Sequence, residues 1–189
     1  MDDQKIYILL TDTGTAFTKT IKRYTKAPYN HSSLSLDREL IQLYSFGRKN
    51  PNNPFNGGFV QENVLKGTYK KFPHTTCAVY EMTITTRQYE KITRMIRLFQ
   101  KKDRKTIYNL LGVFGVAFKE PFEPHGSYFC SQFVAEILHR AGVKLWDKLP
   151  ALVEPDDFRK SEKTVLIYEG LLTAYEPVSG RKKEAGTLI

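Results

Sequence analysis

The 189-residue sequence predicts a single α+β domain with a central antiparallel sheet and helices packed on it. Three observations support this fold class. Several short segments alternate apolar and polar residues, longer segments carry apolar residues at helical spacing, and neither an internal repeat nor a linker interrupts the chain. With 41% hydrophobic and 13% aromatic residues, the chain can bury a sizeable core, which excludes a disordered chain and a small disulfide scaffold. We place the domain at residues 1–176 and expect a flexible tail over residues 177–189, which lack periodicity.

Five segments have the composition of β-strands. In residues 31–36, Leu34 and Leu36 fall on one face and Ser33 and Ser35 on the other, and the next strand is expected to pair with this one across a turn. Residues 75–85 are rich in β-branched side chains, which favour a pleated sheet. The expected strands are Lys5–Thr11, His31–Leu36, Leu40–Phe46, Thr75–Thr85 and Val165–Tyr168.

Three segments are predicted to be helical. Thr86–Lys102 has the clearest apolar stripe, and its first residue is a suitable N-cap. Ser127–Ala141 has a second strong stripe and is expected to end at Gly142. Thr15–Thr25 has a shorter stripe and basic residues on its other side.

Two further segments carry no clear period. Asn50–Gly58 combines asparagine, proline and glycine, a composition that predicts a loop able to shape one wall of a cleft. Ile107–Phe118 is apolar and contains two glycines, so we expect it to pack closely against a neighbour.

The chain carries a formal net charge of +9, which favours anionic partners. The lysines and arginines are scattered rather than blocked, and a solvated basic surface is the simpler interpretation. No helix-turn-helix, zinc-finger or aromatic RNA-binding pattern accompanies the charge, so no specific nucleic-acid partner is predicted.

The sequence predicts a cytoplasmic protein without a transmembrane segment. No run approaches the roughly 18 apolar residues that a membrane span needs, and the acidic start of the chain does not resemble a signal peptide. In a reducing compartment, Cys77 and Cys130 are not expected to form a disulfide. The four histidines lie far apart and no CxxC pair occurs, so no metal site is predicted.

Cys130 is the first candidate for chemistry. It lies near the start of the predicted helix 127–141, where unsatisfied N–H groups and the helix dipole lower the pKa of a thiol. The same N–H groups can stabilise an oxyanion. The alternative is that Cys130 is a small buried core residue.

His31, at the start of a predicted strand, is the natural proton acceptor for a cysteine. A histidine in this position is also compatible with a surface or hydrogen-bonding role. His125, only five residues before the cysteine, is an alternative base.

Two segments resemble those around the catalytic residues of a known enzyme family. They are Tyr29-Asn30-His31-Ser32-Ser33-Leu34 and Phe129-Cys130-Ser131-Gln132-Phe133-Val134-Ala135. The chain resembles the circularly permuted papain-like cysteine hydrolases related to the NlpC cell-wall peptidases, particularly the YiiX-like group. Lecithin retinol acyltransferases share this permuted arrangement, in which the histidine precedes the cysteine. The resemblance covers roughly residues 31–141, and it implies a permuted papain-like fold with Cys130 as nucleophile and His31 as base.

The resemblance also implies a third polar residue, on the strand after the histidine, that orients the imidazole. It points to Ser45, with Gln42 and Tyr44 as alternates, because no acid lies in the body of that strand. A serine stabilises an imidazolium less than a carboxylate does, so we expect the pKa of His31 to stay near its ordinary value. Asp12 and Glu81 are the acids that could complete the site instead.

The implied reaction is hydrolysis of an amide or ester bond through an acyl-enzyme on Cys130, without a cofactor or a metal. The substrate would be a small molecule, a peptide or a lipid acyl group. Two alternatives stay open: acyl transfer to an alcohol or amine, which would need lipid access near Ile107–Phe118, and a non-catalytic module that binds an anion.

Overall fold

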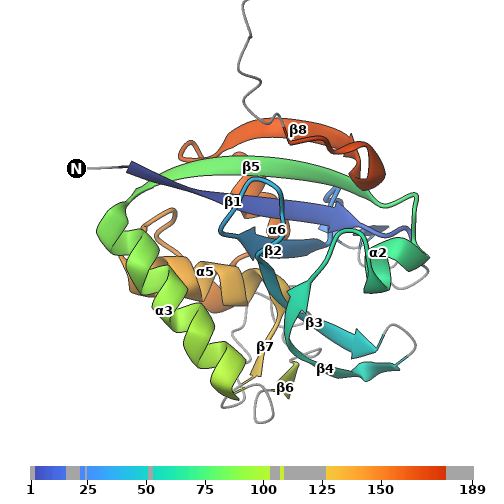
Figure 1. Cartoon of the computed structure of the whole chain (residues 1–189), viewed down its shortest axis with the longest axis horizontal. Helices are drawn as coiled ribbons and strands as arrows, with labels where there is room; N and C mark the ends of the chain where they lie inside the picture. The colour runs from blue at the N-terminus through green and yellow to red at the C-terminus, as the bar shows by residue number, and fades with distance from the viewer. Residues whose placement is uncertain are drawn as a thin grey trace, which may run out of the picture.

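A six-stranded antiparallel sheet forms the centre of the structure, a computed structural model that describes residues 3–15, 22–23, 25–50, 53–102, 107–108 and 127–177. The strand order is β4-β3-β2-β1-β5-β8 (Figure 1). The strands are β1 (Asp3–Asp12), β2 (His31–Ser35), β3 (Leu43–Asn50), β4 (Asn53–Glu62), β5 (Thr76–Thr85) and β8 (Val165–Leu171). The predicted α+β class with a central antiparallel sheet is confirmed.

Two α-helices pack on the main core. They are α3 (Thr86–Lys102) and α5 (Cys130–Ala141), and both contribute to a cluster of buried apolar side chains that includes Leu34, Phe46 and Phe133. Ile92 and Ile96 of α3 are buried in this cluster, as the helical spacing predicts.

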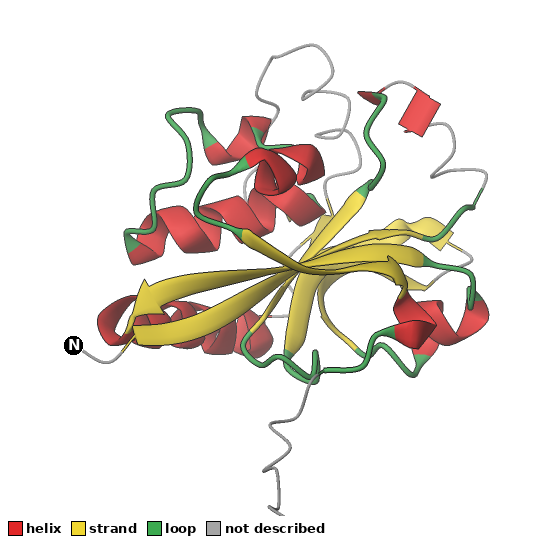
Figure 2. Cartoon of the chain, turned by 90° about the horizontal axis from the view of Figure 1, so that it is seen from above, coloured by secondary structure: helices red, strands yellow, loops and turns green. Residues whose placement is uncertain are grey.

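The shorter helices lie around this core. They are α2 (Gly67–Lys71), α6 (Pro155–Lys160) and the 3-10 turns η2 (Pro150–Leu152) and η3 (Leu172–Ala174). Tyr69 of α2 and Leu172 of η3 belong to a second apolar cluster with Leu9, Leu43 and Cys77. Figure 2 shows the twisted sheet with helices on both sides.

The start of α5 differs from the predicted helix boundary at residue 127. Residues Ser127–Tyr128 form the short strand β7, which pairs in parallel with β6 (Ile107–Tyr108). Phe129 is the extended N-cap residue, so Cys130 is the first residue of the helix. The helix ends at the left-handed Gly142, at φ 83°, as predicted.

Two boundaries in the sheet also differ from the sequence prediction. The strand β3 begins at Leu43 instead of Leu40, because the Asp37 carboxylate accepts the backbone N–H groups of Ile41 and Gln42 and extends the turn. The predicted loop Asn50–Gly58 is wrong for most of its length, since β3 runs to Asn50 and β4 begins at Asn53. Proline and glycine are tolerated there because β4 is an edge strand.

Several predicted segments lie wholly or largely outside the described residues. These are most of Thr15–Thr25, of which residues 22, 23 and 25 are helical, most of Ile107–Phe118, and residues 178–189 of the predicted tail. Among the helices that the structure describes, none is long and apolar enough to cross a membrane.

Candidate active site

The Cys130 thiol lies at the N-terminus of α5, where the helix packs against β2 and β3. The first turn carries no acidic residue that would oppose ionisation of the thiol. The residue is 6% exposed, so the thiol is largely shielded from water.

His31 is the first residue of β2 and is paired with Thr11 of β1. Its imidazole lies beside the Cys130 thiol, close enough for each group to shift the pKa of the other. The sulfur also lies 4.0 Å from the carbonyl oxygen of Asn30, and the nearby backbone N–H groups of Ser32 and Ser131 lower the pKa of the thiol. The structure therefore brings together His31 and Cys130, the two candidate residues from the sequence, which lie 99 positions apart in the chain.

Glu62, the last residue of β4, is the group that holds the imidazole. The His31 Nε2 donates to Glu62 Oε1 over 2.8 Å, which leaves Nδ1 as the ring nitrogen available to the thiol. Both side chains are shielded, with 22% of His31 and 14% of Glu62 exposed. The resulting order is thiol, imidazole and carboxylate, in which each group contacts the next.

Three hydroxyl groups complete the surroundings of the Glu62 carboxylate. Ser45 Oγ donates to Oε1 over 2.7 Å, while Ser33 Oγ and the Tyr69 hydroxyl donate to Oε2 over 2.6 and 3.1 Å. With His31, each carboxylate oxygen receives two donors, which together use the hydrogen-bonding capacity of an ionised carboxylate. The surroundings therefore favour the negative charge of Glu62 in spite of its burial.

The predicted role of Ser45 as the residue that orients His31 is corrected by this geometry. Ser45 lies at the site, but its hydroxyl donates to Glu62, and the carboxylate contacts the imidazole. Neither alternate on this segment fits the role. Tyr44 points into the main core, where its ring stacks on Phe59. Gln42 is exposed and precedes the first residue of β3.

The two acids that the sequence offered as substitutes lie in other interactions. Glu81 forms a salt bridge with Lys5. Asp12 accepts hydrogen bonds from the Gly14 N–H, the Asn30 amide and the Lys22 ammonium group. Asp12 therefore positions Asn30, the residue before His31, whose carbonyl oxygen faces the sulfur, but Asp12 forms no hydrogen bond or ion pair with the described imidazole.

The charges of the site favour a thiolate–imidazolium pair. Burial alone would lower the pKa of His31, but Glu62, the Cys130 thiolate and the hydrogen bonds to both raise it to about 10. Burial alone would raise the pKa of the Cys130 thiol, but the imidazolium and the backbone N–H groups lower it below its usual value. The expectation of a near-ordinary pKa for His31 is therefore wrong, because it assumed a site without a carboxylate.

Cys77 provides a contrast within the same chain. It lies in β5, is 0% exposed, and packs in the second apolar cluster with Leu9 and Val79. Burial, with a smaller effect of Glu169, raises the pKa of the Cys77 thiol to about 12. We therefore expect the Cys77 thiol to stay protonated and unreactive in the folded protein.

We expect Cys77→Ala to leave the reactivity of Cys130 unchanged and to lower the free energy of unfolding by ~1–2 kcal/mol, because it removes a buried sulfur from a packed cluster. Urea denaturation of the variant and the wild type checks the stability. A variant of unchanged stability would show that this cluster is not well packed around the thiol.

Among the residues that the structure describes, no group of three or more His, Cys, Asp or Glu side chains could hold a metal ion. Neither of the other two described histidines joins the site. His74 and His139 are exposed, and His125, the alternative base, lies outside the described residues.

A scan against protein-family models gives no match to this chain, and a search of curated proteins gives none either.

Glu62 is the functional residue that the sequence interpretation missed. The loop predicted over Asn50–Gly58 places no strand before Glu62, so its sequence position does not predict that this carboxylate lies beside His31. Phe59-Val60-Gln61-Glu62 does not alternate apolar and polar residues, so the only strand signal there is the aromatic and β-branched pair Phe59-Val60 directly after the glycines.

Proposed function

We propose that this protein is a thiol-dependent hydrolase that cleaves an amide or ester bond through an acyl-enzyme on Cys130. The main support for the proposal is the arrangement of three groups: the His31 imidazole lies beside the Cys130 thiol and donates to the Glu62 carboxylate over 2.8 Å. A core cysteine has no need for an imidazole partner that is in turn held by a shielded carboxylate.

In the first half of the reaction, the Cys130 thiolate attacks the carbonyl carbon of the substrate. The negative charge that develops on the carbonyl oxygen is stabilised by the Cys130 N–H at the start of α5. The His31 imidazolium then gives its proton to the departing amine or alcohol, and the acyl group remains on sulfur as a thioester.

In the second half, the neutral His31 accepts a proton from water as the water oxygen attacks the thioester. The acid product leaves, and the proton on His31 restores the thiolate–imidazolium pair. Glu62 keeps its negative charge throughout, fixes the tautomer through Nε2, and stabilises the imidazolium by its charge.

We also propose that the fold is the permuted papain-like type of the NlpC-related, YiiX-like hydrolases, and that the protein acts in the cytoplasm. The order of the parts supports the family assignment, since the histidine strand β2 precedes the cysteine helix α5 and the helix packs on that strand. Both cysteines are free, which suits a reducing compartment.

The direct test is acylation of the folded protein with a chromogenic acyl ester, followed by mass spectrometry of the peptide adducts. We expect a transient acyl group on Cys130 that disappears as acid product accumulates. A lasting adduct released only by an added alcohol or amine would instead assign acyl transfer, and acylation no faster than that of the unfolded chain would contradict catalysis.

The hydroxyl of Tyr69 gives a further prediction for this site. Tyr69 is 6% exposed, and burial followed by the nearby Glu62 raises its pKa well above the usual value, so the phenol stays protonated and always donates. Tyr69→Phe keeps the packing but removes one donor from the carboxylate. We expect Glu62 to gain a proton at higher pH, which moves the acid limit of Cys130 alkylation upward by ~1 pH unit.

The matched control for this change is Tyr175→Phe. Tyr175 packs against the same apolar cluster as Tyr69, but its hydroxyl donates to the carbonyl oxygen of Arg38. We expect this variant to keep the wild-type pH profile. An unchanged profile in Tyr69→Phe as well would limit Tyr69 to a packing role.

A further inference from the structure

The outer face of α3 carries a row of exposed cations. Arginines and lysines recur along this face at positions that helical spacing brings to one side, and the only acid among them is Glu90. The exposed cations are Arg87, Lys91, Arg94, Arg97 and Lys101. Five positive charges and one negative charge give this face a net +4 of the chain's +9.

These five cations have no salt-bridge partner among the described residues, in contrast to many other exposed cations of the chain. On α5, for example, Arg140 pairs with Glu136, and on α6, Arg159 and Lys160 both pair with Asp156. On α3, even the i,i+4 neighbours Glu90 and Arg94 form no pair. The charge of this face is therefore available to an external partner.

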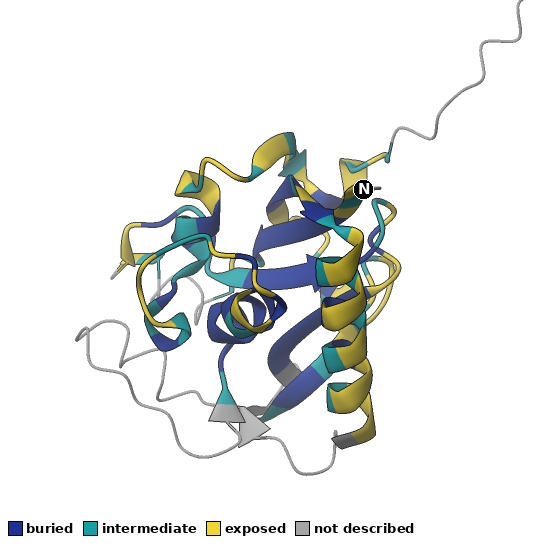
Figure 3. Ribbon diagram, turned by 90° about the vertical axis from the view of Figure 1, so that its left-hand side faces the viewer, coloured by how far each residue is buried: buried dark blue, intermediate teal, exposed yellow. Residues whose placement is uncertain are grey.

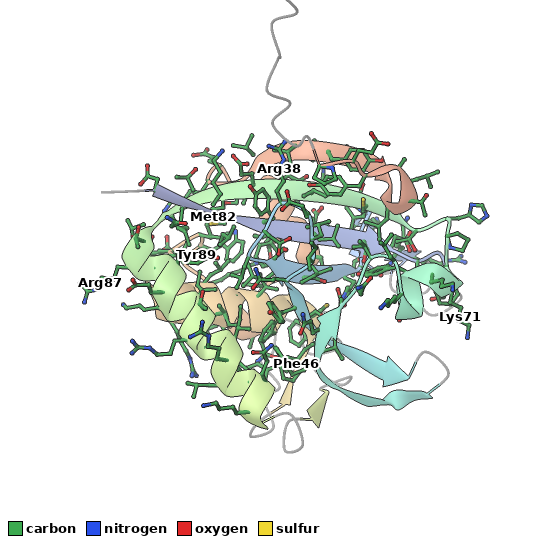
Figure 4. All side chains as sticks on the ribbon, viewed as in Figure 1. Arg38, Phe46, Lys71, Met82, Arg87 and Tyr89 are labelled. Carbon is green, nitrogen blue, oxygen red and sulfur yellow. The ribbon has the colours of Figure 1, made fainter. Side chains whose placement is uncertain are left out.

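The other side of α3 is not available. Ile92 and Ile96 are buried in the main core, and Tyr89 and Phe99 pack against it. Figure 4 shows Arg87 projecting away from the body of the protein and Tyr89 directed toward the sheet, and Figure 3 shows the exposed side of the helix along its length. A partner can therefore contact only the cationic side.

We propose that this face of α3 binds the surface of an anionic lipid bilayer. Four to eight lysines and arginines on an amphipathic helix are typical of binding to anionic headgroups. A straight helix of 17 residues is ~25 Å long and can lie along a flat surface over its whole length. Leu98, at 51% exposed, lies among these cations, and the headgroup region accommodates an apolar side chain that a phosphate backbone does not.

A nucleic acid fits this face less well. Binding to single strands combines cations with aromatic side chains on which bases stack. The aromatic residues of α3, Tyr89 and Phe99, are turned toward the core. Because the apolar side of α3 is occupied, binding to the bilayer is electrostatic and reversible, and it weakens as salt screens the charges.

Sedimentation of the full chain with phosphatidylcholine vesicles, with and without phosphatidylserine, tests the proposal. We expect binding only to the phosphatidylserine vesicles, and its loss as the salt concentration rises. The double variant Arg94→Glu/Arg97→Glu should bind at least ~tenfold more weakly, because it reverses two charges in the middle of the row.

The matched control is Lys66→Glu/Lys70→Glu, which changes the net charge equally at exposed positions around α2, far from α3 (Figure 1). It should retain most of the binding, and circular dichroism should show both variants folded. Equal binding to both vesicle types, or an equal loss in the control, would overturn the proposal. Displacement from the vesicles by a duplex oligonucleotide that binds more tightly at physiological salt would assign the face to nucleic acid instead. The pH profile of Cys130 alkylation should be the same in every variant, so this test is independent of the proposed hydrolase activity.

Discussion

Replacement of Cys130 by alanine is expected to reduce turnover of any amide or ester substrate by a factor of ~10³ or more, because it removes the atom that forms the covalent intermediate. Cys130→Ser should be almost as inactive. A serine hydroxyl at this position has a far higher pKa than the thiol and would not ionise beside His31. Steady-state hydrolysis of a chromogenic ester measures both effects.

The fold should survive either change, since the side chain at the first turn of α5 is small and its replacement removes little buried area. Near-UV circular dichroism and a thermal melt check this. Cys77→Ala is the matched control, because it removes the other thiol and should leave turnover intact. Hydrolysis that persists in a folded Cys130→Ala protein would rule out the acyl-enzyme proposed above.

Glu62→Gln is expected to have the second-largest effect on the site. The substitution keeps the shape and can still accept the Nε2 hydrogen bond, but it removes the charge that most strongly raises the pKa of His31. The imidazolium then loses stabilisation, and the thiol retains its proton to higher pH. We expect turnover to fall by ~10–10³-fold and the acid limit of Cys130 alkylation to move upward by at least ~1 pH unit.

Glu81→Gln is the control for Glu62→Gln, because it makes the same chemical change in an acid that pairs with Lys5 outside the site. Both the alkylation profile and the turnover should match those of the wild type. If Glu62→Gln also matches the wild type in both measurements, then the carboxylate contributes only to packing between β2, β3 and β4.

The sequence was sufficient to predict the antiparallel sheet, the two main helices and the two residues, His31 and Cys130, that meet at the start of β2. These features depend on local patterns: β-rich composition for β1, period-2 alternation for β2 and β5, helical spacing for α3, and a left-handed glycine that ends α5. The meeting of Cys130 with His31 followed from the resemblance, which placed the cysteine helix against the histidine strand.

Glu62, the carboxylate that contacts His31, could not be predicted in the same way, because its position beside His31 depends on how β4 pairs with β3. In the register of β3 and β4, Glu62 lies opposite Leu43, which places its carboxylate beside Ser45 and across from His31. The glycines and the proline near the start of β4 indicate a loop when they are considered alone. They are accommodated because β4 has a neighbour on one side only.

Ser45 shows how a correct location can lead to a wrong role. Its strand does lie next to that of His31, and its hydroxyl is at the site. The hydroxyl stabilises the charge of Glu62, however, and the carboxylate holds the ring. Burial would raise the pKa of Glu62, and the hydrogen bonds and charge of His31, together with the hydrogen bonds from Ser33 and Ser45, lower it below its usual value.

The central claim is that Cys130 and His31 form an ion pair supported by Glu62, and the rate of iodoacetamide alkylation as a function of pH tests it most directly. Because the pKa of the Cys130 thiol is lowered, the thiol ionises at a lower pH than an ordinary cysteine. The pKa of His31 is raised to about 10, so the imidazole keeps its proton over the same range. We therefore predict that Cys130 is already alkylated rapidly at about pH 5–6 and that the rate stays nearly constant to about pH 9, with Cys77 unlabelled in the folded protein. A rate that is negligible at about pH 6 and rises with a midpoint near 8.5, the ordinary pKa of a cysteine, would show that the thiol is neutral at rest and would contradict the account.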